Sequence, residues 1–515
     1  MMETSHSISG TNRSRTALAV RAGLGVVGEY LRRPAVAMTL LAALLASQVL
    51  PLWSPTPDGL GYMSIARSMA HGGPVTNLGS PKLHYPPGYP LLVSPLFWFS
   101  DRPLFLLLVA QWVFLVLLML GVYCWARRWY PDGALAITAL VMANASLWMH
   151  ARTTLSEPSF MALLVWTAYV FDRLKAAASA REAVRWGLLG SLLLTALAMI
   201  KPVGVLLVSG YGVAVLLRAW RGQLSWLRAA AIACLMPLPA AVAVAALVAY
   251  EAHTGRLVGT IENPTYLHEF KASDVSLPAQ LIEGVRVRGS EIGRLVLPGM
   301  FKSYAAPYQW LNINMALYVP VACLFVWAWW HVARRGGNAL MLAFPAFLAL
   351  YIAYPADQGT RYLLPMLPVL AVCLWWLVGQ LPRQRAGWLS ALIAAHLIVA
   401  LSYSIAGTVK LQRLNAQWPA ADAMAEILRD SGDSARNWKL PRGMAEMVTL
   451  SADRYVCEAY ENNEIPADAT LLLTDAATTD IPGFVERQRA GTLKLLVREE
   501  RLTRGLPSRG PAIER

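Results

Sequence analysis

WSPTPDGLGYMSIARSMAHGG, residues 53–73, follows directly on an apolar run that is long enough to cross a membrane. One carboxylate, Asp58, stands just beyond the end of that run. Aspartate is a favoured helix N-cap, so Asp58 has an ordinary structural interpretation. A carboxylate at a membrane surface can also act as a general base. The two interpretations are compatible, because a capping aspartate can still face a site.

The residues after Asp58 predict a short amphipathic helix. Apolar side chains recur there at i, i+3, i+4 and i+7. They are Tyr62, Ile65, Ala66 and Met69. Arg67 and Ser68 fall off this face, and Gly72 with Gly73 would end the helix. We expect this helix to lie on the membrane surface.

The composition predicts a membrane protein. Hydrophobic residues make up 56% of the 515 residues and charged residues only 15%, which is too apolar for an ordinary soluble chain. The apolar residues come in blocks of about 17–25, the length that crosses ~30 Å of hydrocarbon. The expected fold is therefore mainly α, a polytopic bundle of transmembrane helices. We assign the net charge of +14 to basic loops, and no nucleic-acid partner is expected.

Eleven membrane-spanning segments are predicted. They are residues 35–53, 104–126, 133–150, 159–172, 186–200, 202–217, 229–250, 314–333, 339–355, 362–381 and 387–405. Lys and Arg concentrate in alternate connections, such as Arg127–Arg128 and Arg334–Arg335. By the positive-inside rule, this asymmetry places the N-terminus in the cytoplasm.

The chain divides into three regions. Residues 1–34 form a basic cytoplasmic N-terminus, residues 35–405 the transmembrane domain, and residues 406–515 a C-terminal domain outside the membrane. Two long outer loops, 54–103 and 251–313, belong to the transmembrane domain. In the C-terminal region, WPAADAMAEILRD has helical spacing, while ATLLLTD and TLKLLVR are apolar runs of strand length. These patterns predict a small α/β domain.

Four ionisable residues collect at the outer ends of different predicted spans. They are Asp58, Glu157, Lys201 and Arg361. Each has an ordinary interpretation: the acids as helix caps, the lysine as a snorkelling side chain and the arginine as an interfacial anchor. Their occurrence together at one face favours a site instead, because ionisable groups near membrane spans are costly and mark function.

This set of groups suits transfer chemistry on a phosphate-bearing lipid. Two cations can hold a phosphate, Arg as a fork and Lys as a point charge. One carboxylate can accept the proton of an attacking hydroxyl. The second acid can hold a divalent metal or orient the first. A phosphate at a membrane boundary indicates a lipid-linked phosphate.

Two segments of the first outer loop, PDGLGYMSIARSMAHGG and YPPGYPLLVSPLF, resemble the first periplasmic loop of GT-C glycosyltransferases. The resemblance is to the protein O-mannosyltransferase and aminoarabinose transferase-like group, and it extends to TTLSEPSF, IKPVG and TRYLLPMLP in the same order. These enzymes use polyprenyl-phosphate-linked sugars as donors. The resemblance therefore implies a GT-C-like catalytic domain and the same kind of donor.

The resemblance implies roles for individual residues. Asp58 matches the catalytic base, and Glu157 matches a second acidic position. Lys201 and Arg361 match positions that contact the donor phosphate. The residues expected to line the substrate cavity are Tyr62, His84, Tyr85 and Tyr362.

This chain departs from the family pattern at two positions. Many relatives have an acid directly after the loop aspartate, where this chain has Gly59, and many have a lysine before the Pro-Pro pair, where it has Tyr85. The first departure leaves the metal open: no cofactor is assigned, and a divalent cation, Mg or Mn, held by Asp58 and Glu157 stays an alternative.

The expected function is an inverting sugar transfer from a polyprenyl phosphate to an acceptor hydroxyl, with Asp58 as general base. The acceptor would be a lipid, a glycan or a protein of the cell envelope. The enzyme would sit in the bacterial cytoplasmic (inner) membrane with its site facing the periplasm. The alternative is a lipid-linked glycan flippase or another transporter. The apolar centres of the predicted spans favour the enzyme, because transporters carry polar groups near the bilayer midplane.

Overall fold

The computed structural model describes most of the membrane domain and the elements of the C-terminal domain. The described residues are 33–47, 52–73, 85–257, 276–296, 309–334, 338–353, 359–381, 385–431, 435–438, 444–452, 457–459, 471–475, 481, 484–491 and 493–498. The chain forms two compact units, residues 1–47 and residues 48–515. The first unit contains helix α2 (Pro34–Ala46), and the second contains every other described element.

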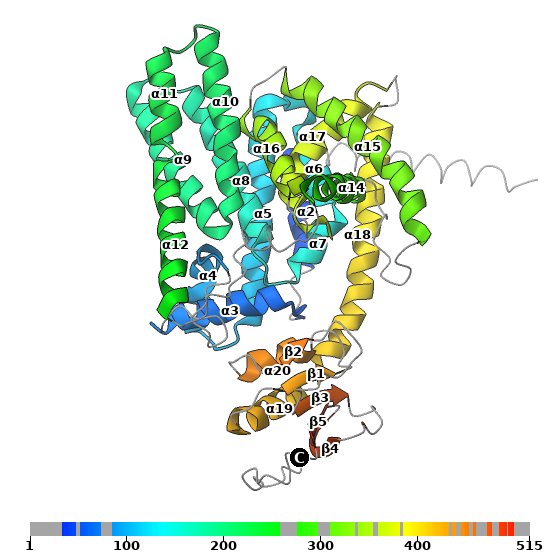
Figure 1. The fold of residues 1–515 in the computed structure, drawn as a ribbon. Coiled ribbons are helices and arrows are strands. Elements are labelled where there is room, and N and C mark those ends of the chain that lie inside the picture. Colours follow the sequence, from blue (N-terminus) through cyan, green and yellow to red (C-terminus); the bar gives the residue numbers. More distant parts are fainter. Residues whose placement is uncertain are drawn as a thin grey trace, which may run out of the picture. The chain divides into compact units, whose positions relative to one another are not determined.

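The second unit is built mainly of long helices (Figure 1). Their bounds are α5 Leu104–Trp129, α6 Ala134–Met142, α7 Ala145–Ala151, α8 Glu157–Lys175, α9 Ala180–Ile200, η3 Pro202–Leu206, α10 Leu207–Trp220, α11 Trp226–Leu235, α12 Leu238–Leu257, α14 Leu277–Val296, α15 Gln309–Ala333, α16 Ala339–Ala353, α17 Leu367–Val378 and α18 Arg385–Asn415. Every predicted span contains a helix, so the expectation of a mainly helical fold is confirmed.

Four helical segments among the described residues are both long and apolar enough to cross a membrane. They are Leu104–Trp129, Ala180–Ile200, Pro202–Trp220 and Gly387–Asn415. Five further apolar helices are shorter, among them Pro34–Ala46 and Ala339–Ala353. The long apolar helices support an integral membrane protein, while the count of eleven spans stays a prediction.

Two predicted spans are each two helices in the structure. The span 133–150 is interrupted at Asn144, whose extended backbone begins α7 and whose side chain accepts a hydrogen bond from the Ser146 amide at 3.0 Å. The Asn144 amide group also donates to the Leu295 carbonyl at 2.7 Å. The span 229–250 is divided between α11 and α12 near Pro237, which has no amide hydrogen for the helix ladder.

The predicted outer loop at 251–313 contains helical structure that its length did not suggest. Helix α12 runs on to Leu257, and α14 (Leu277–Val296) packs against α15 and α16. The charged residues of α14 made it read as a loop, yet Arg288 and Glu291 are buried against each other. A buried ion pair in an amphipathic helix lowers the apparent hydropathy of the segment without exposing it.

The first outer loop folds around α3 (Pro57–Ala70), which lies across the direction of the long helices (Figure 1). The predicted helix, its apolar face and its end at Gly72, with φ 67°, are confirmed. The face packs inside the protein, because Tyr62, Ile65 and Ala66 are at most 4% exposed. Protein therefore covers this face, and the placement of the helix at the membrane surface stays a prediction. Two short helices, α4 (Gly88–Val93) and η1 (Ser94–Trp98), pack against α3.

The C-terminal region is a small α/β domain, as predicted. A five-stranded sheet has the order β2-β1-β3-β5-β4. β1 pairs in parallel with β2 and β3, while β5 pairs antiparallel with β3 and β4. The elements are α19 Trp418–Ser431, β1 Ala435–Trp438, α20 Met444–Ala452, β2 Cys457–Ala459, β3 Leu471–Asp475, β4 Phe484–Ala490 and β5 Leu493–Arg498. Helix α18 continues to Asn415, past residue 406, and the predicted domain boundary stays a prediction.

Helices α10 and α16 cross at Gly210. A Cβ atom there would overlap the backbone of Ala339 and Ala343, whereas a Cβ at Gly212, two residues further along α10, would meet nothing within 4 Å. The absence of a side chain at Gly210 therefore lets the two helices touch.

We expect Gly210→Ala to lower the free energy of unfolding by about 1–3 kcal/mol, because overpacking forces the backbones apart. Gly212→Ala is the matched control, and the better helix propensity of alanine makes it neutral or stabilising by up to about 1 kcal/mol. Thermal unfolding of the full chain in lipid nanodiscs measures both. Equal midpoints for the two variants would contradict this packing.

Candidate active site

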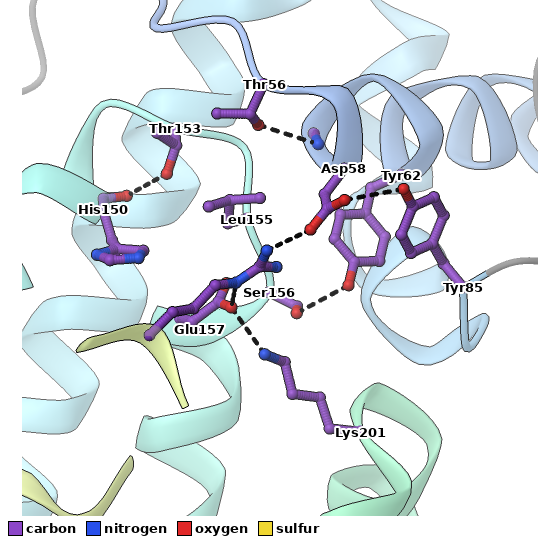
Figure 2. Close-up of polar contacts among 12 residues, drawn as sticks. Thr56, Asp58, Tyr62, Tyr85, His150, Thr153, Leu155, Ser156, Glu157 and Lys201 are labelled. Atoms are coloured by element: carbon purple, nitrogen blue, oxygen red, sulfur yellow. Dashed lines mark hydrogen bonds and ion pairs between the residues drawn. The ribbon is translucent and has the colours of Figure 1, made fainter. Parts of the chain in front are cut away.

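The four ionisable residues predicted from the sequence meet in one ionic array, of which Figure 2 labels Asp58, Glu157 and Lys201. The Arg361 guanidinium donates to both carboxylates, through Nη1 to Asp58 Oδ2 and through Nε to Glu157 Oε1. Lys201 Nζ donates to the same Glu157 oxygen at 2.7 Å. Residues from α3, α8, η4 (Gly359–Arg361) and the end of α9 are thereby joined.

Asp58 does not cap its helix. The N-cap of α3 is Thr56, whose Oγ1 accepts a hydrogen bond from the Gly59 amide at 3.1 Å. Asp58 lies within the first turn, and its carboxylate accepts from Arg361 and, at 2.9 Å through Oδ1, from Tyr85 Oη. The capping interpretation of Asp58 is therefore wrong, and its side chain is left to face the array.

Glu157 begins α8 and is fully buried. Buried hydrogen bonds hold the segment in front of it: Gln111 Nε2 donates to the Leu155 carbonyl at 2.8 Å, and Tyr62 Oη lies 3.1 Å from Ser156 Oγ. The Glu157 carboxylate itself is directed at Lys201 and Arg361. An ionic partner therefore accounts for this acid, beyond the favourable helix N-terminus that the sequence suggested.

Lys201 ends α9 in an extended conformation, immediately before η3. Its side chain is only 17% exposed and lies 5.9 Å from the centre of the Phe160 ring. Arg361 is also 17% exposed. Both cations point into the protein at Glu157, so the interpretations as a snorkelling lysine and an interfacial arginine are wrong.

The array is balanced in charge, with two carboxylates and two cations. Burial alone would raise the pKa of Glu157, but the positive charges of Lys201 and Arg361 outweigh it and hold that pKa well below its usual range. Burial lowers the pKa of Lys201, although Glu157 opposes the shift. Asp58, with a side chain 31% exposed, is the most accessible member. Asp58 is therefore the member of the array that a ligand from solvent can reach most easily.

Two polar atoms at the centre of the array can each form a further hydrogen bond. Glu157 Oε2 is buried and has no hydrogen-bond partner among the described residues. Arg361 binds the acids through Nε and Nη1, and Nη2 donates to no residue in the described part of the chain. A guanidinium with a free edge can bind a further oxyanion.

The residues expected to line a substrate cavity have different surroundings. Tyr62 and Tyr85 pack with tilted rings whose centres lie 4.8 Å apart, and Tyr85 contacts Asp58. Burial, and after it the charge of Glu157, raises the pKa of Tyr62 well above its usual value, so its phenol stays protonated. Tyr362 stacks on Tyr351 with centres 5.3 Å apart. His84 lies outside the described residues, and a cavity lined by these residues stays a prediction.

Arg288 and Glu291 support the site and were missed by sequence reasoning. The Arg288 guanidinium lies 5.5 Å from the centre of the Tyr362 ring, next to Arg361, and its Nε donates to the Tyr351 carbonyl at 2.9 Å. Glu291 accepts from Arg288 at 2.6 Å. The available signal was the i, i+3 spacing of the two charges in an amphipathic pattern.

The surroundings of Asp58 and Glu157 are a poor fit to a metal ion. Arg361 lies between the two acids and donates to both, where a shared divalent cation would have to sit. No group of three or more His, Cys, Asp or Glu gathers in the described residues. A Cβ at residue 59 would also collide with the hydroxyls of Thr154 and Thr56, so a second acid next to Asp58 has no room.

Comparison with solved structures identifies the fold. The structure of ArnT from Cupriavidus metallidurans bound to undecaprenyl phosphate aligns with a TM-score of 0.54 at 12% identity, over 90% of this chain and 97% of ArnT. The apo form of the same ArnT aligns at 0.52 and 12% identity, over 95% and 100%. The oligosaccharyltransferase AglB from Archaeoglobus fulgidus, in complex with an inhibitory peptide and a dolichol-phosphate, aligns at 0.51 and 13% identity, over 87% and 70%.

ArnT and AglB are both GT-C proteins, and this chain has the GT-C fold. The resemblance that the loop motifs indicated is thus confirmed at the level of the fold. No protein-family model matches the sequence. Comparison with curated protein sequences also finds no match. The fold is therefore shared while the sequences have diverged widely.

The Glu157–Lys201 pair allows a direct test of the array. We expect Lys201→Met to lower the free energy of unfolding by about 1–3 kcal/mol, because it removes one of the two cations that neutralise a buried carboxylate; the figure is at the low end for buried pairs since Lys201 is partly exposed. Glu157→Gln combined with Lys201→Met should cost less than the two single changes added together. Additive effects would contradict the pairing.

The pH dependence of stability tests the same pair. A carboxylate with a depressed pKa contributes stability that is complete above the pKa of the unfolded chain, about 4.3, and is lost as the pH falls through the folded-state value. We therefore expect unfolding midpoints of the wild type to fall more steeply below about pH 4 than those of Glu157→Gln. Parallel curves would contradict the depressed pKa.

Proposed function

We propose that this protein is a membrane glycosyltransferase that uses a sugar linked to a polyprenyl phosphate. The observation that carries the proposal is the ionic array, in which one arginine joins two carboxylates within a GT-C fold. ArnT, which shares that fold, is bound to undecaprenyl phosphate in its structure. A phosphate ligand suits this array, because Arg361 and Lys201 have N–H groups beyond those that bind the two carboxylates within the described part of the chain.

Asp58 is the proposed general base. It is the most exposed member of the array, and Tyr85 and Arg361 fix both of its oxygens. The acceptor hydroxyl gives its proton to the Asp58 carboxylate while its oxygen forms a bond to the anomeric carbon of the sugar. The bond from that carbon to the phosphate oxygen breaks, and its electron pair stays on the phosphate. A single displacement of this kind inverts the anomeric configuration.

Arg361 and Lys201 are the proposed donor-phosphate ligands. Arg361 keeps Nη2 available after binding both acids, and Lys201 Nζ has two further hydrogens after donating to Glu157. Negative charge grows on the phosphate as it leaves, and preorganised cations stabilise such charge most strongly in a site that excludes water. Glu157 has the role of keeping both cations charged and in place.

The acceptor and the membrane side are further parts of the proposal. A lipid, glycan or protein hydroxyl of the cell envelope would enter beside Asp58, on the periplasmic side of the bacterial inner membrane. The concentration of Lys and Arg at the opposite helix ends supports this orientation. A divalent cation is not needed for the proposed chemistry, since Arg361 and Lys201 supply the positive charge at the phosphate.

The central test is Asp58→Asn. We expect it to slow transfer from a polyprenyl-phosphate sugar by about 10²–10⁴-fold, the usual contribution of general acid–base catalysis. Donor binding should stay close to wild type. The unfolding midpoint should fall only slightly, because asparagine keeps a side-chain oxygen for Arg361 and Tyr85 and the ion pair that is lost is partly exposed. Transfer is measured as labelled sugar appearing on an envelope acceptor, with purified full-length protein.

Asp101→Asn is the matched control, since Asp101 belongs to the same outer loop and has a side chain 81% exposed. It should transfer at the wild-type rate. Turnover by Asp58→Asn at the wild-type rate would contradict the role of Asp58 as general base. Labelled lipid that crosses a vesicle membrane without any new glycosidic bond would instead support the transporter alternative.

A further inference from the structure

A cavity of about 730 Å³ lies at the other end of α8, the helix that begins with Glu157 of the array. Its walls are the C-terminal ends of α5, α8, α10 and α15, together with the start of α16. Three indoles, Trp129, Trp329 and Trp330, form part of the wall. Neither the sequence motifs nor the proposed transfer reaction uses this cavity.

Helix α8 relates the cavity to the candidate active site. Its first residue is Glu157 and its last is Lys175, which lines the cavity. An α-helix of this length spans roughly 28 Å, close to the ~30 Å thickness of the hydrocarbon core. The cavity therefore opens at the opposite membrane boundary from the active site.

Positive charge dominates the cavity wall. Five cationic side chains line it: Arg128, Lys175, Arg218, Arg221 and Arg334. The lining contains a single carboxylate, Asp172, which is held by Trp129 Nε1 at 2.6 Å and Lys175 Nζ at 2.7 Å. The four arginines make no ion pair with a carboxylate within the described part of the chain. One acid cannot neutralise five cations, so the cavity attracts anions.

Topology and helix dipoles explain part of this charge but not its arrangement. Cations are favoured at helix C-termini and in cytoplasmic loops, whether or not their side chains face a cavity. Arg127, in the last turn of α5, meets both demands without lining the cavity, whereas the five lining cations converge on it from the ends of four helices. Convergence on one cavity requires a further reason, and an anionic ligand supplies one.

We propose that this cavity binds the phosphate head group of a membrane lipid. Guanidinium groups match phosphate oxygens with paired hydrogen bonds, and four arginines line the cavity. Among the described residues, Arg128, Arg218 and Arg334 each use one nitrogen in a bond to the protein, which leaves the other N–H groups of each guanidinium for a ligand. The volume falls in the ordinary range for small-molecule sites, about 300–1,000 Å³. The indoles belong at a membrane boundary, where their rings can contact the first carbons of the lipid chains. The protein thus has a lipid-phosphate site at each membrane face.

Native mass spectrometry of the full chain tests this proposal. Protein released from phosphatidylcholine nanodiscs is titrated with phosphatidylglycerol, undecaprenyl phosphate or inorganic diphosphate. The test variant is Arg128→Gln combined with Arg221→Gln, and the control of equal charge is Arg127→Gln combined with Arg181→Gln. Arg127 and Arg181 are exposed and lie outside the cavity lining, so the control removes charge without altering the cavity.

We expect at least one of the two phospholipid probes to bind the wild type, and the cavity variant to bind it at least tenfold more weakly. The control should differ from wild type by less than twofold. The probe that binds identifies the lipid class. Equal losses in the two variants would overturn the proposal by showing only a general charge effect. Diphosphate binding as tightly as the lipids would overturn it by showing a site for soluble phosphates.

Discussion

The hydrogen bonds of Arg361 to Asp58 and Glu157 are the interaction on which the candidate active site depends. They tie the first outer loop to the start of α8 and to the segment before α17, which lie far apart in the chain. A buried carboxylate such as Glu157 is tolerable only with charged partners, and Lys201 supplies the second one. Arg361, which makes the burial of Glu157 possible, also binds Asp58 and so fixes the position of this more exposed carboxylate.

Sequence reasoning reached the helical class, the helix after Asp58, the α/β domain and the four members of the array. Each left a local signal: apolar blocks, helical spacing, strand-length runs, and rare charges at the ends of apolar segments. The ionic partners of those charges had no such signal. Arg361 joins residues from distant segments, and only packing of the helices decides which cation meets which acid.

The errors have physical reasons of the same kind. Asp58 was a reasonable N-cap, but Thr56 competes for that role and the helix begins at Pro57, which favours the first helical position. The sequence predicts an outer loop where α14 stands, because its charged residues, among them the buried Arg288–Glu291 pair, interrupt any apolar block of membrane-spanning length. Tyr85, which replaces a common lysine of the family pattern, contacts Asp58 directly, and only its placement beside α3 makes this visible.

Helix α8 links two charged regions, the balanced array at its start and the cationic cavity at its end. The central claim concerns the first: Arg361 and Lys201 hold the phosphate of a lipid-linked donor beside Asp58. An experimental structure of the full chain with bound polyprenyl phosphate tests it most directly. The account predicts phosphate oxygens within about 4 Å of Lys201 Nζ and the Arg361 guanidinium, the distance of an ion pair. A phosphate bound elsewhere, with the array unchanged, would contradict it.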